Sequence, residues 1–153
     1  MKRSNSALSV ALVTVASVSL AGCETVLTET HPLDGTGWAL VEVDRDGVSS
    51  KLRPRLSERH TISFSSDGGM LAQLDCNRGS AKWSASMPTI AERGERGTIE
   101  IGNIAATRAL CPSPSFGEQM AAGLSGVANY RLTQNRSRLV IRLRGTRFIF
   151  RAN

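Results

Sequence analysis

The feature that most constrains the fold is a two-residue alternation of apolar and polar side chains in short segments. Residues 60–77, HTISFSSDGGMLAQLDCN, alternate on both sides of an Asp-Gly-Gly turn signal. This pattern places alternate side chains on opposite faces and is typical of a β-hairpin. Its second half puts four residues on one face: Met70, Ala72, Leu74 and Cys76. We therefore expect Cys76 to face inward, with Asp75 and Asn77 on the other side.

Similar segments predict further strands. They are residues 36–45, which end at an Asp-Gly turn signal, and residues 81–86, 98–104, 130–134, 138–143 and 146–152. The polar segments 49–59 and 92–97 are predicted to be loops, since the first contains Pro54 and the second is charged and punctuated by glycine.

One segment has helical periodicity instead. Ser115 and Glu118 have the spacing of a capping box, and Asn129 marks the expected end of the helix. Between them an apolar stripe recurs at helical intervals: Phe116, Met120, Leu124 and Val127, with Ala121 and Ala128 beside them. The sequence therefore predicts an α+β fold, a small and mostly antiparallel β-sheet, partly barrel-like, with one amphipathic helix packed on it.

The N-terminus has the regions of a secretory signal peptide. A basic head, Lys2-Arg3, precedes an apolar run that is shorter than the ~20 residues needed to span a membrane. The run closes with Leu20-Ala21-Gly22-Cys23, which resembles the lipobox of bacterial lipoproteins. The alternative is an ordinary signal peptide whose cleavage site lies near a cysteine. The resemblance implies a signal peptide over 1–22, a lipidated N-terminus and tether over 23–32, and a domain over 33–153.

The lipobox resemblance also implies a location. Cys23 would carry a diacylglyceryl group, and its acyl chains would hold the protein on the membrane. Glu24 follows it, rather than the aspartate associated with inner-membrane retention in many diderm bacteria. We therefore expect a cell-envelope protein, anchored by lipid to the outer membrane and facing the periplasm.

Cysteine usage predicts a disulfide. If Cys23 is lipidated, Cys76 and Cys111 remain in an oxidising compartment, where an even pair indicates a bridge. A bridge across that length of chain would stabilise the fold by roughly 4 kcal/mol through loop-closure entropy.

Taken in order, these segments resemble the META domain, also called the HslJ-like family, over residues 33–151. The resemblance rests on Cys76-Asn77-Arg78-Gly79 followed by Trp83, and on Thr107 and Cys111 further along. Asp75 stands where glycine is usual in the family, and Ala109-Leu110 stand where methionine and alanine are usual. The resemblance implies a small, mainly antiparallel domain of secreted and envelope proteins. The family is associated with heat or envelope stress and drug tolerance, and it has no established enzymatic activity.

The sequence gives little support for a catalytic site or a metal site. A cysteine hydrolase needs a histidine base, and only His31, in the predicted tether, and His60, at the start of a strand, are present. A catalytic pair of His60 and Cys76 would require Cys76 to be a free thiol, which excludes the disulfide. The scattered cysteines and histidines lack the spacing of a zinc site, and no glycine-rich loop opens a helix. We predict that the protein is not an enzyme and has no metal or cofactor.

Two groups of polar residues are candidates for ligand contact. Asn77 and Arg78 either bond locally or line a groove. No acidic residue follows Glu118, although seven arginines do, so Arg142 and Arg144 are candidates for contact with an anion. The alternative is a solvated face, since the 19 basic residues comprise sixteen arginines and three lysines.

These observations favour a lipid-anchored envelope protein that acts by binding and supports envelope integrity or stress tolerance. The expected partners are the membrane, through the lipid, and an anionic envelope component or another envelope protein; nucleic acid is not expected. The main alternative is an inhibitor of a lytic or proteolytic enzyme, and a Cys76-dependent hydrolase is less favoured.

Overall fold

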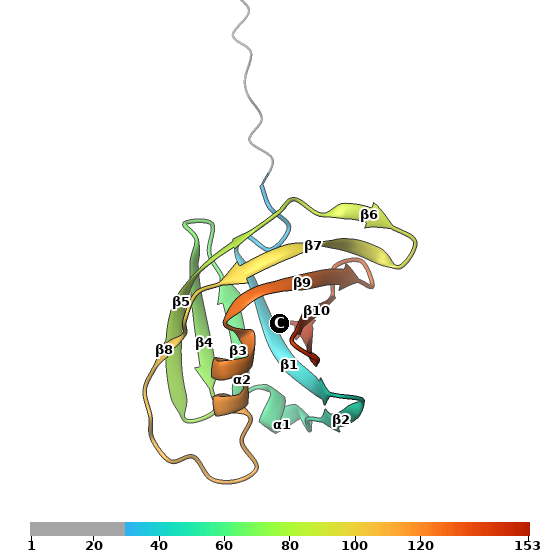
Figure 1. Ribbon diagram of the computed structural model, residues 1–153. Helices are drawn as coiled ribbons and strands as arrows, with labels where there is room; N and C mark the ends of the chain where they lie inside the picture. The colour runs from blue at the N-terminus through green and yellow to red at the C-terminus, as the bar shows by residue number, and fades with distance from the viewer. Residues whose placement is uncertain (1–29) are drawn as a thin grey trace, which may run out of the picture.

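The computed structural model describes residues 30–153, which form an eight-stranded antiparallel β-barrel (Figure 1). The barrel strands are β1 (Thr36–Arg45), β3 (His60–Phe64), β4 (Gly69–Leu74), β5 (Asn77–Ala85), β7 (Gly94–Ile101), β9 (Gly126–Thr133), β10 (Arg138–Leu143) and β11 (Thr146–Ala152). Three short strands lie outside the ring: β2 (Val48–Lys51) beside β1, β6 (Thr89–Ala91) beside β7, and β8 (Ala105–Ala106) beside β5. The helices are α1 (Pro54–Ser57) and α2 (Gly117–Leu124).

Two pairings make the barrel a closed ring. The order of strands is β7-β9-β10-β11-β1-β3-β4-β5, and β5 pairs again with β7 through Trp83 and Ile101. The pairing of β1 with β11 joins the first strand to the last. The prediction of a mostly antiparallel sheet is confirmed, but the sheet closes on itself and the described residues contain two short helices.

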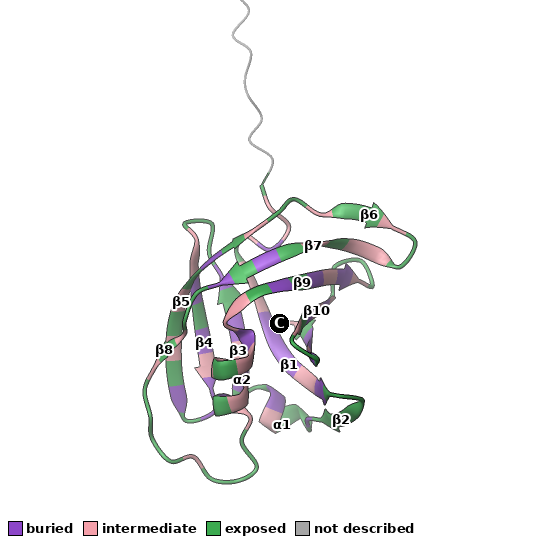
Figure 2. Cartoon of the chain, viewed as in Figure 1, coloured by how far each residue is buried: buried purple, intermediate pink, exposed green. Residues whose placement is uncertain are grey.

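Alternating side chains fill the interior of the barrel, as expected for eight strands. On β9, for example, Ala128, Tyr130 and Leu132 are buried and Asn129 is exposed, as Figure 2 shows for the strands generally. The helix α2 adds Met120 and Leu124 to this core. It approaches closely because Gly123 has no side chain: a Cβ there would lie 2.5 Å from the ring of Phe148.

The predicted helix was too long. Its N-cap residue is Phe116 instead of the predicted Ser115, so the helix begins one residue later, at Gly117, and Phe116 makes no side-chain capping bond. It ends at Leu124 because Gly126, with φ 119°, redirects the chain into β9. Val127, predicted to belong to the buried stripe, is therefore an exposed strand residue, and Asn129 also lies in β9.

The two predicted loops contain regular structure. Residues 49–59 include most of β2 and all of α1, and residues 92–97 form the turn from β6 into the first part of β7. None of the helices in the described part of the chain has the length and apolar character to cross a membrane. The signal peptide and Cys23 lie outside the described residues, so the lipobox prediction stays a prediction.

Candidate functional site

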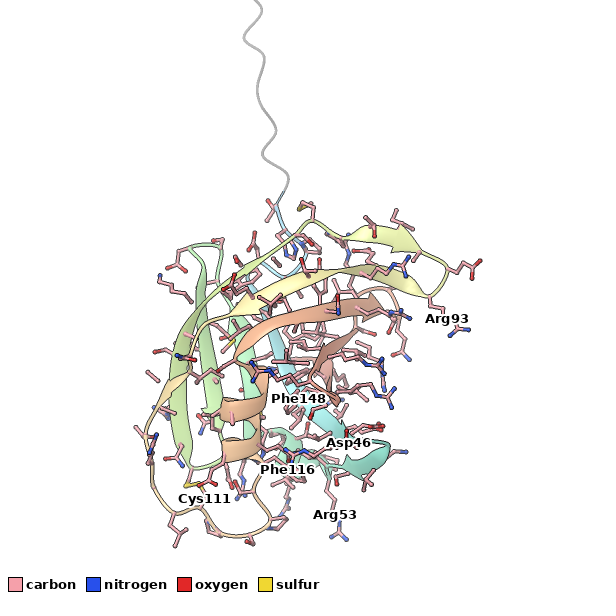
Figure 3. The ribbon with its side chains drawn as sticks, in the orientation of Figure 1. Asp46, Arg53, Arg93, Cys111, Phe116 and Phe148 are labelled. Atoms are coloured by element: carbon pink, nitrogen blue, oxygen red, sulfur yellow. A yellow bond between two sulfur atoms is a disulfide. The ribbon has the colours of Figure 1, made fainter. Side chains whose placement is uncertain are left out.

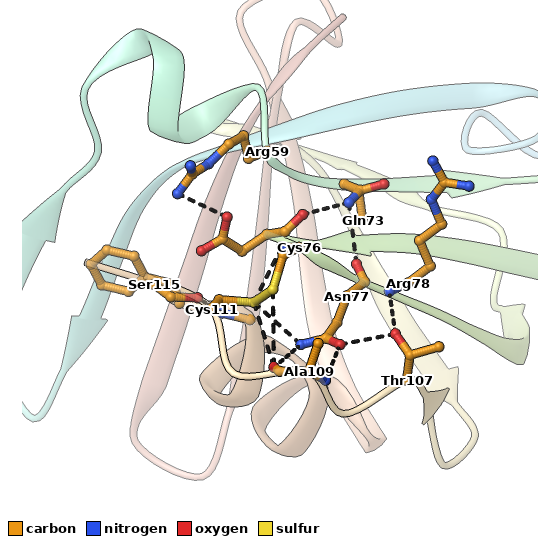
Figure 4. Close-up of a disulfide and its surroundings, with 12 residues drawn as sticks. Arg59, Gln73, Cys76, Asn77, Arg78, Thr107, Ala109, Cys111 and Ser115 are labelled. Carbon is orange, nitrogen blue, oxygen red and sulfur yellow. Dashed lines mark hydrogen bonds and ion pairs between the residues drawn. A yellow bond between two sulfur atoms is a disulfide. The ribbon is translucent and has the colours of Figure 1, made fainter. Parts of the chain in front are cut away.

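The segments that carry the family resemblance meet at a disulfide between Cys76 and Cys111 (Figure 4). The predicted bridge is confirmed. The predicted orientation of Cys76 is wrong, because the residue lies exposed in the turn between β4 and β5. Asp75 has φ 67° there, and this turn of the backbone interrupts the alternation. Asp75 and Asn77, predicted to face away, are the buried residues.

Asn77 holds the loop that follows β8. Its Oδ1 accepts hydrogen bonds from the Ala109 amide at 2.7 Å and the Thr107 hydroxyl at 2.9 Å, and its Nδ2 donates to the Ala109 carbonyl at 2.9 Å. The Arg78 backbone amide donates to the Thr107 hydroxyl, and the Arg78 side chain is exposed. The Asn77 amide is thus bonded to the chain itself, as in the local interpretation, and Asn77 also lines the groove described below.

The backbone at Asp75 suits the glycine that the family resemblance implies at this position. A φ of 67° lies in the left-handed region, which glycine enters without a steric cost. Here the aspartate adopts it, and its side chain is 2% exposed. Oδ1 lies 2.8 Å from the Arg59 guanidinium, whereas Oδ2 is buried without a hydrogen-bond partner in the described residues.

His60 is fully buried in β3, and its ring forms hydrogen bonds with α1 and with the residue directly before α2. Its Nε2 accepts a hydrogen bond from the Phe116 amide at 3.0 Å, so Nδ1 carries the proton that it donates to the Leu56 carbonyl at 2.7 Å. Burial lowers the pKa of His60 below its ordinary value. With both ring nitrogens engaged and the Cys76 sulfur bonded to Cys111, the two are not arranged as a base and a nucleophile.

His31 packs on the barrel instead of continuing the predicted tether. Its Nε2 lies 3.1 Å from both the Ser86 carbonyl and the Tyr130 hydroxyl, and its ring meets Trp83 edge-on. Burial raises the pKa of Tyr130 to about 12.

The first of two grooves lies between α2 and the loop 103–110. This helix groove has a volume of about 840 Å³. Small side chains line much of it, including Ala105, Ala109, Ala121 and Ala122, and Asn77 lies among the lining residues.

The second groove, of about 740 Å³, is the arginine groove. Five arginines line it: Arg93, Arg96, Arg131, Arg142 and Arg147. Nitrogen-tipped side chains gather beside β9 and β10, and Arg93 lies at the far end of the hairpin of β6 and β7 (Figure 3). The predicted contact residue Arg142 thus lines a groove. Arg144 does not, because it forms the turn between β10 and β11 with φ 47°.

Arg93 and Arg96 were missed as candidates because their segment was interpreted as a loop. Within residues 30–153, no three His, Cys, Asp or Glu side chains gather as they would around a metal ion.

Comparisons with known proteins give one family match. The model of the META domain matches residues 31–153. A protein from Burkholderia xenovorans, solved by NMR, superposes with a TM-score of 0.60 at 18% identity, covering 79% of this chain and 83% of that one; this likeness shows the fold alone. A lipocalin-like protein from Bacteroides uniformis (17% identity, 78% and 97% covered) and an uncharacterized protein from Bacteroides eggerthii (14%, 79% and 99%) each reach a TM-score of 0.43. No curated protein matches the chain.

Proposed function

The chain belongs to the META domain family, and from that premise we propose that it is an envelope lipoprotein that acts by binding rather than catalysis. A lipid on Cys23 would hold the barrel at the outer membrane, facing the periplasm. There it would support envelope integrity or stress tolerance by contacting an envelope component.

The observation that carries this proposal is the way the helix groove is built. The loop that forms one wall is held by the Cys76–Cys111 disulfide, by Asn77 and, where α2 begins, by the bond from Phe116 to His60. Ligand sites are usually pre-formed concave pockets of ~300–1,000 Å³, and the groove falls in this range. The residues of the family resemblance thus serve to fix the wall of a groove.

Filling the helix groove tests the proposal. Ala122 is exposed and lines the groove, so Ala122→Trp occupies it without entering the core. Val127→Trp is the matched control, since Val127 is 64% exposed and lies outside the groove. In a strain that lacks the protein and is sensitive to detergent, we expect the wild type and Val127→Trp to restore growth and Ala122→Trp to fail. Full rescue by Ala122→Trp would remove the groove from the function.

The anchor is tested separately. Radiolabelled palmitate should be incorporated into the wild type and not into Cys23→Ala. Equal labelling of the two proteins would remove Cys23 as the site of lipidation.

An inhibitor of lytic enzymes is a second candidate, favoured by one observation. Leu110 is fully exposed, and it lies directly before Cys111 and its disulfide. An exposed apolar side chain on a loop held in this way suits insertion into an active site. The purified full-length chain should then slow lysozyme or another lytic enzyme at micromolar concentration, and Leu110→Asp should abolish the effect. If no lytic enzyme is slowed, this candidate is removed.

A further inference from the structure

The strand register arranges the arginine groove in two rows on the outside of the barrel. In one row, Asn129 on β9 faces Arg142 on β10, which in turn faces Arg147 on β11. In the other, Arg96 on β7 faces Arg131 on β9. The rows lie two residues apart along the strands, or about 7 Å, and neighbouring strands lie about 4.8 Å apart. The four arginines therefore form a diagonal band over four adjacent strands.

This band places like charges against each other. Two pairs in the band are direct cross-strand partners, Arg96 with Arg131 and Arg142 with Arg147. A third pair outside the band, Arg138 with Arg151, lies further along β10 and β11. Like charges directly opposite each other destabilise a sheet. The arginine pairs therefore destabilise the sheet by their mutual repulsion. On β10 the residue opposite Arg131 is the uncharged Val140, so the repulsion does not extend along that row.

The described residues neutralise these charges only in part, through Asp44, whose carboxylate bonds to Arg147 and also interacts with Arg142. Of the three ion pairs among residues 30–153, only the one between Arg147 and Asp44 involves the band. No carboxylate lines the groove, and the other lining residues include the hydrogen-bonding side chains Thr98 and Asn129. A concave surface lined by charge of one sign concentrates counter-ions of the other sign.

We infer that the arginine groove binds a ligand that carries two or more closely spaced phosphate groups. Guanidinium groups pair with phosphate through two parallel hydrogen bonds, and a band of adjacent arginines offers several such pairs at the separation of neighbouring strands. The inference goes beyond the binding role proposed above, because the arginine groove and the helix groove have no lining residue in common. The phosphates could belong to a soluble molecule or to a lipid headgroup.

Two measurements on the full-length chain in a non-ionic detergent test the inference and separate the two sources. Calorimetric titration with sodium tripolyphosphate reports on a soluble ligand. Calorimetric titration with mixed micelles of that detergent and the bisphosphorylated lipid A, compared with micelles of the detergent alone, reports on a headgroup. Binding in either measurement supports the inference, and the pattern tells which source is used.

Matched variants assign the binding to the groove. Arg96→Gln/Arg142→Gln removes two charges from the band, and Arg53→Gln/Arg55→Gln removes the same number from exposed positions around α1. We expect the first to weaken binding at least about tenfold, since charge-assisted hydrogen bonds are lost, and the second to leave it within about twofold.

Three results would overturn the inference. One is an absence of binding to both probes by the wild type, and another is an equal loss in the two double variants, which would indicate a general charge effect. The third is a lower thermal midpoint for Arg96→Gln/Arg142→Gln, because removing the repulsion should leave the barrel at least as stable. The detergent-rescue experiment with Ala122→Trp is independent of all three, so the proposed function can stand if this ligand class fails.

Discussion

Replacing Asn77 should loosen the loop that follows β8 and destabilise the fold. Asn77→Ala removes three side-chain hydrogen bonds to Thr107 and Ala109. Each such bond contributes about 1 kcal/mol net, and an unsatisfied partner adds more only where water cannot reach it. Thr107 and Ala109 are exposed, so water can replace the lost partner. We therefore expect the free energy of unfolding to fall by about 3 kcal/mol.

Urea unfolding followed by tryptophan fluorescence measures this loss, since Trp38 and Trp83 are both buried in the barrel. Arg78→Ala is the control, because Arg78 meets Thr107 through its backbone only and its substitution should stay within about 0.5 kcal/mol. Asn77→Asp keeps the acceptor and loses the donor, so it should fall between the two. A loss for Asn77→Ala no larger than that for Arg78→Ala would refute the assignment of Asn77 as the clamp of the loop.

Three other predictions concern the same end of the barrel. Replacing both Cys76 and Cys111 by serine should lower the free energy of unfolding by roughly 4 kcal/mol through loop-closure entropy; an unchanged urea midpoint would contradict this. Burial lowers the folded-state pKa of His60 below 6.5, so the unfolded state binds more protons between the two pKa values. Stability should therefore fall as the pH drops below about 6.5, and His60→Gln should flatten this part of the urea-midpoint profile; an equal slope in both proteins would argue against it. Arg59→Ala strands the buried Asp75 carboxylate and should cost roughly 2 kcal/mol, less than for a fully buried pair because Arg59 is 47% exposed. Asp75→Gly removes that charge and suits the positive φ, so it should cost less than Arg59→Ala; the reverse order in urea unfolding would disprove the account.

The strands were the most predictable part of the fold. Residues 60–74, 138–143 and 146–152 alternate in sequence as they do in β3, β4, β10 and β11. Closure of the ring was not predictable in the same way. It depends on Trp83 meeting Ile101, and local periodicity carries no information about which strands pair.

Two errors came from single backbone angles. Counting alternate residues through Asp75 placed Cys76 inside, but the φ of 67° shifts the alternation by one. The family's usual glycine at this position was a signal for such an angle. In the same way, Val127 and Ala128 fit the helical stripe, but Gly126 starts a strand in which Ala128 and Tyr130 alternate into the core.

The cationic face was predictable only in part. The excess of arginine after Glu118 pointed to Arg142, which lines the groove. Arg144 is only two residues away in sequence, but it lies in the turn. Arg96 joins the groove because β7 pairs with β9, a contact between segments that the sequence does not reveal.

The pairing of β1 with β11 has a consequence for how the protein is made. β1 is the first strand of the barrel, and it cannot pair fully until β11, the last strand, is available. Trp38 pairs with Ala152, and the Asn153 amide donates to the Gly37 carbonyl. Until β11 pairs with β1, the partly formed sheet has two unpaired edges, which can pair with other chains. Removal of residues 147–153 would take away nearly all of β11, the only strand that joins β10 to β1 within residues 30–153, so the ring could no longer close there.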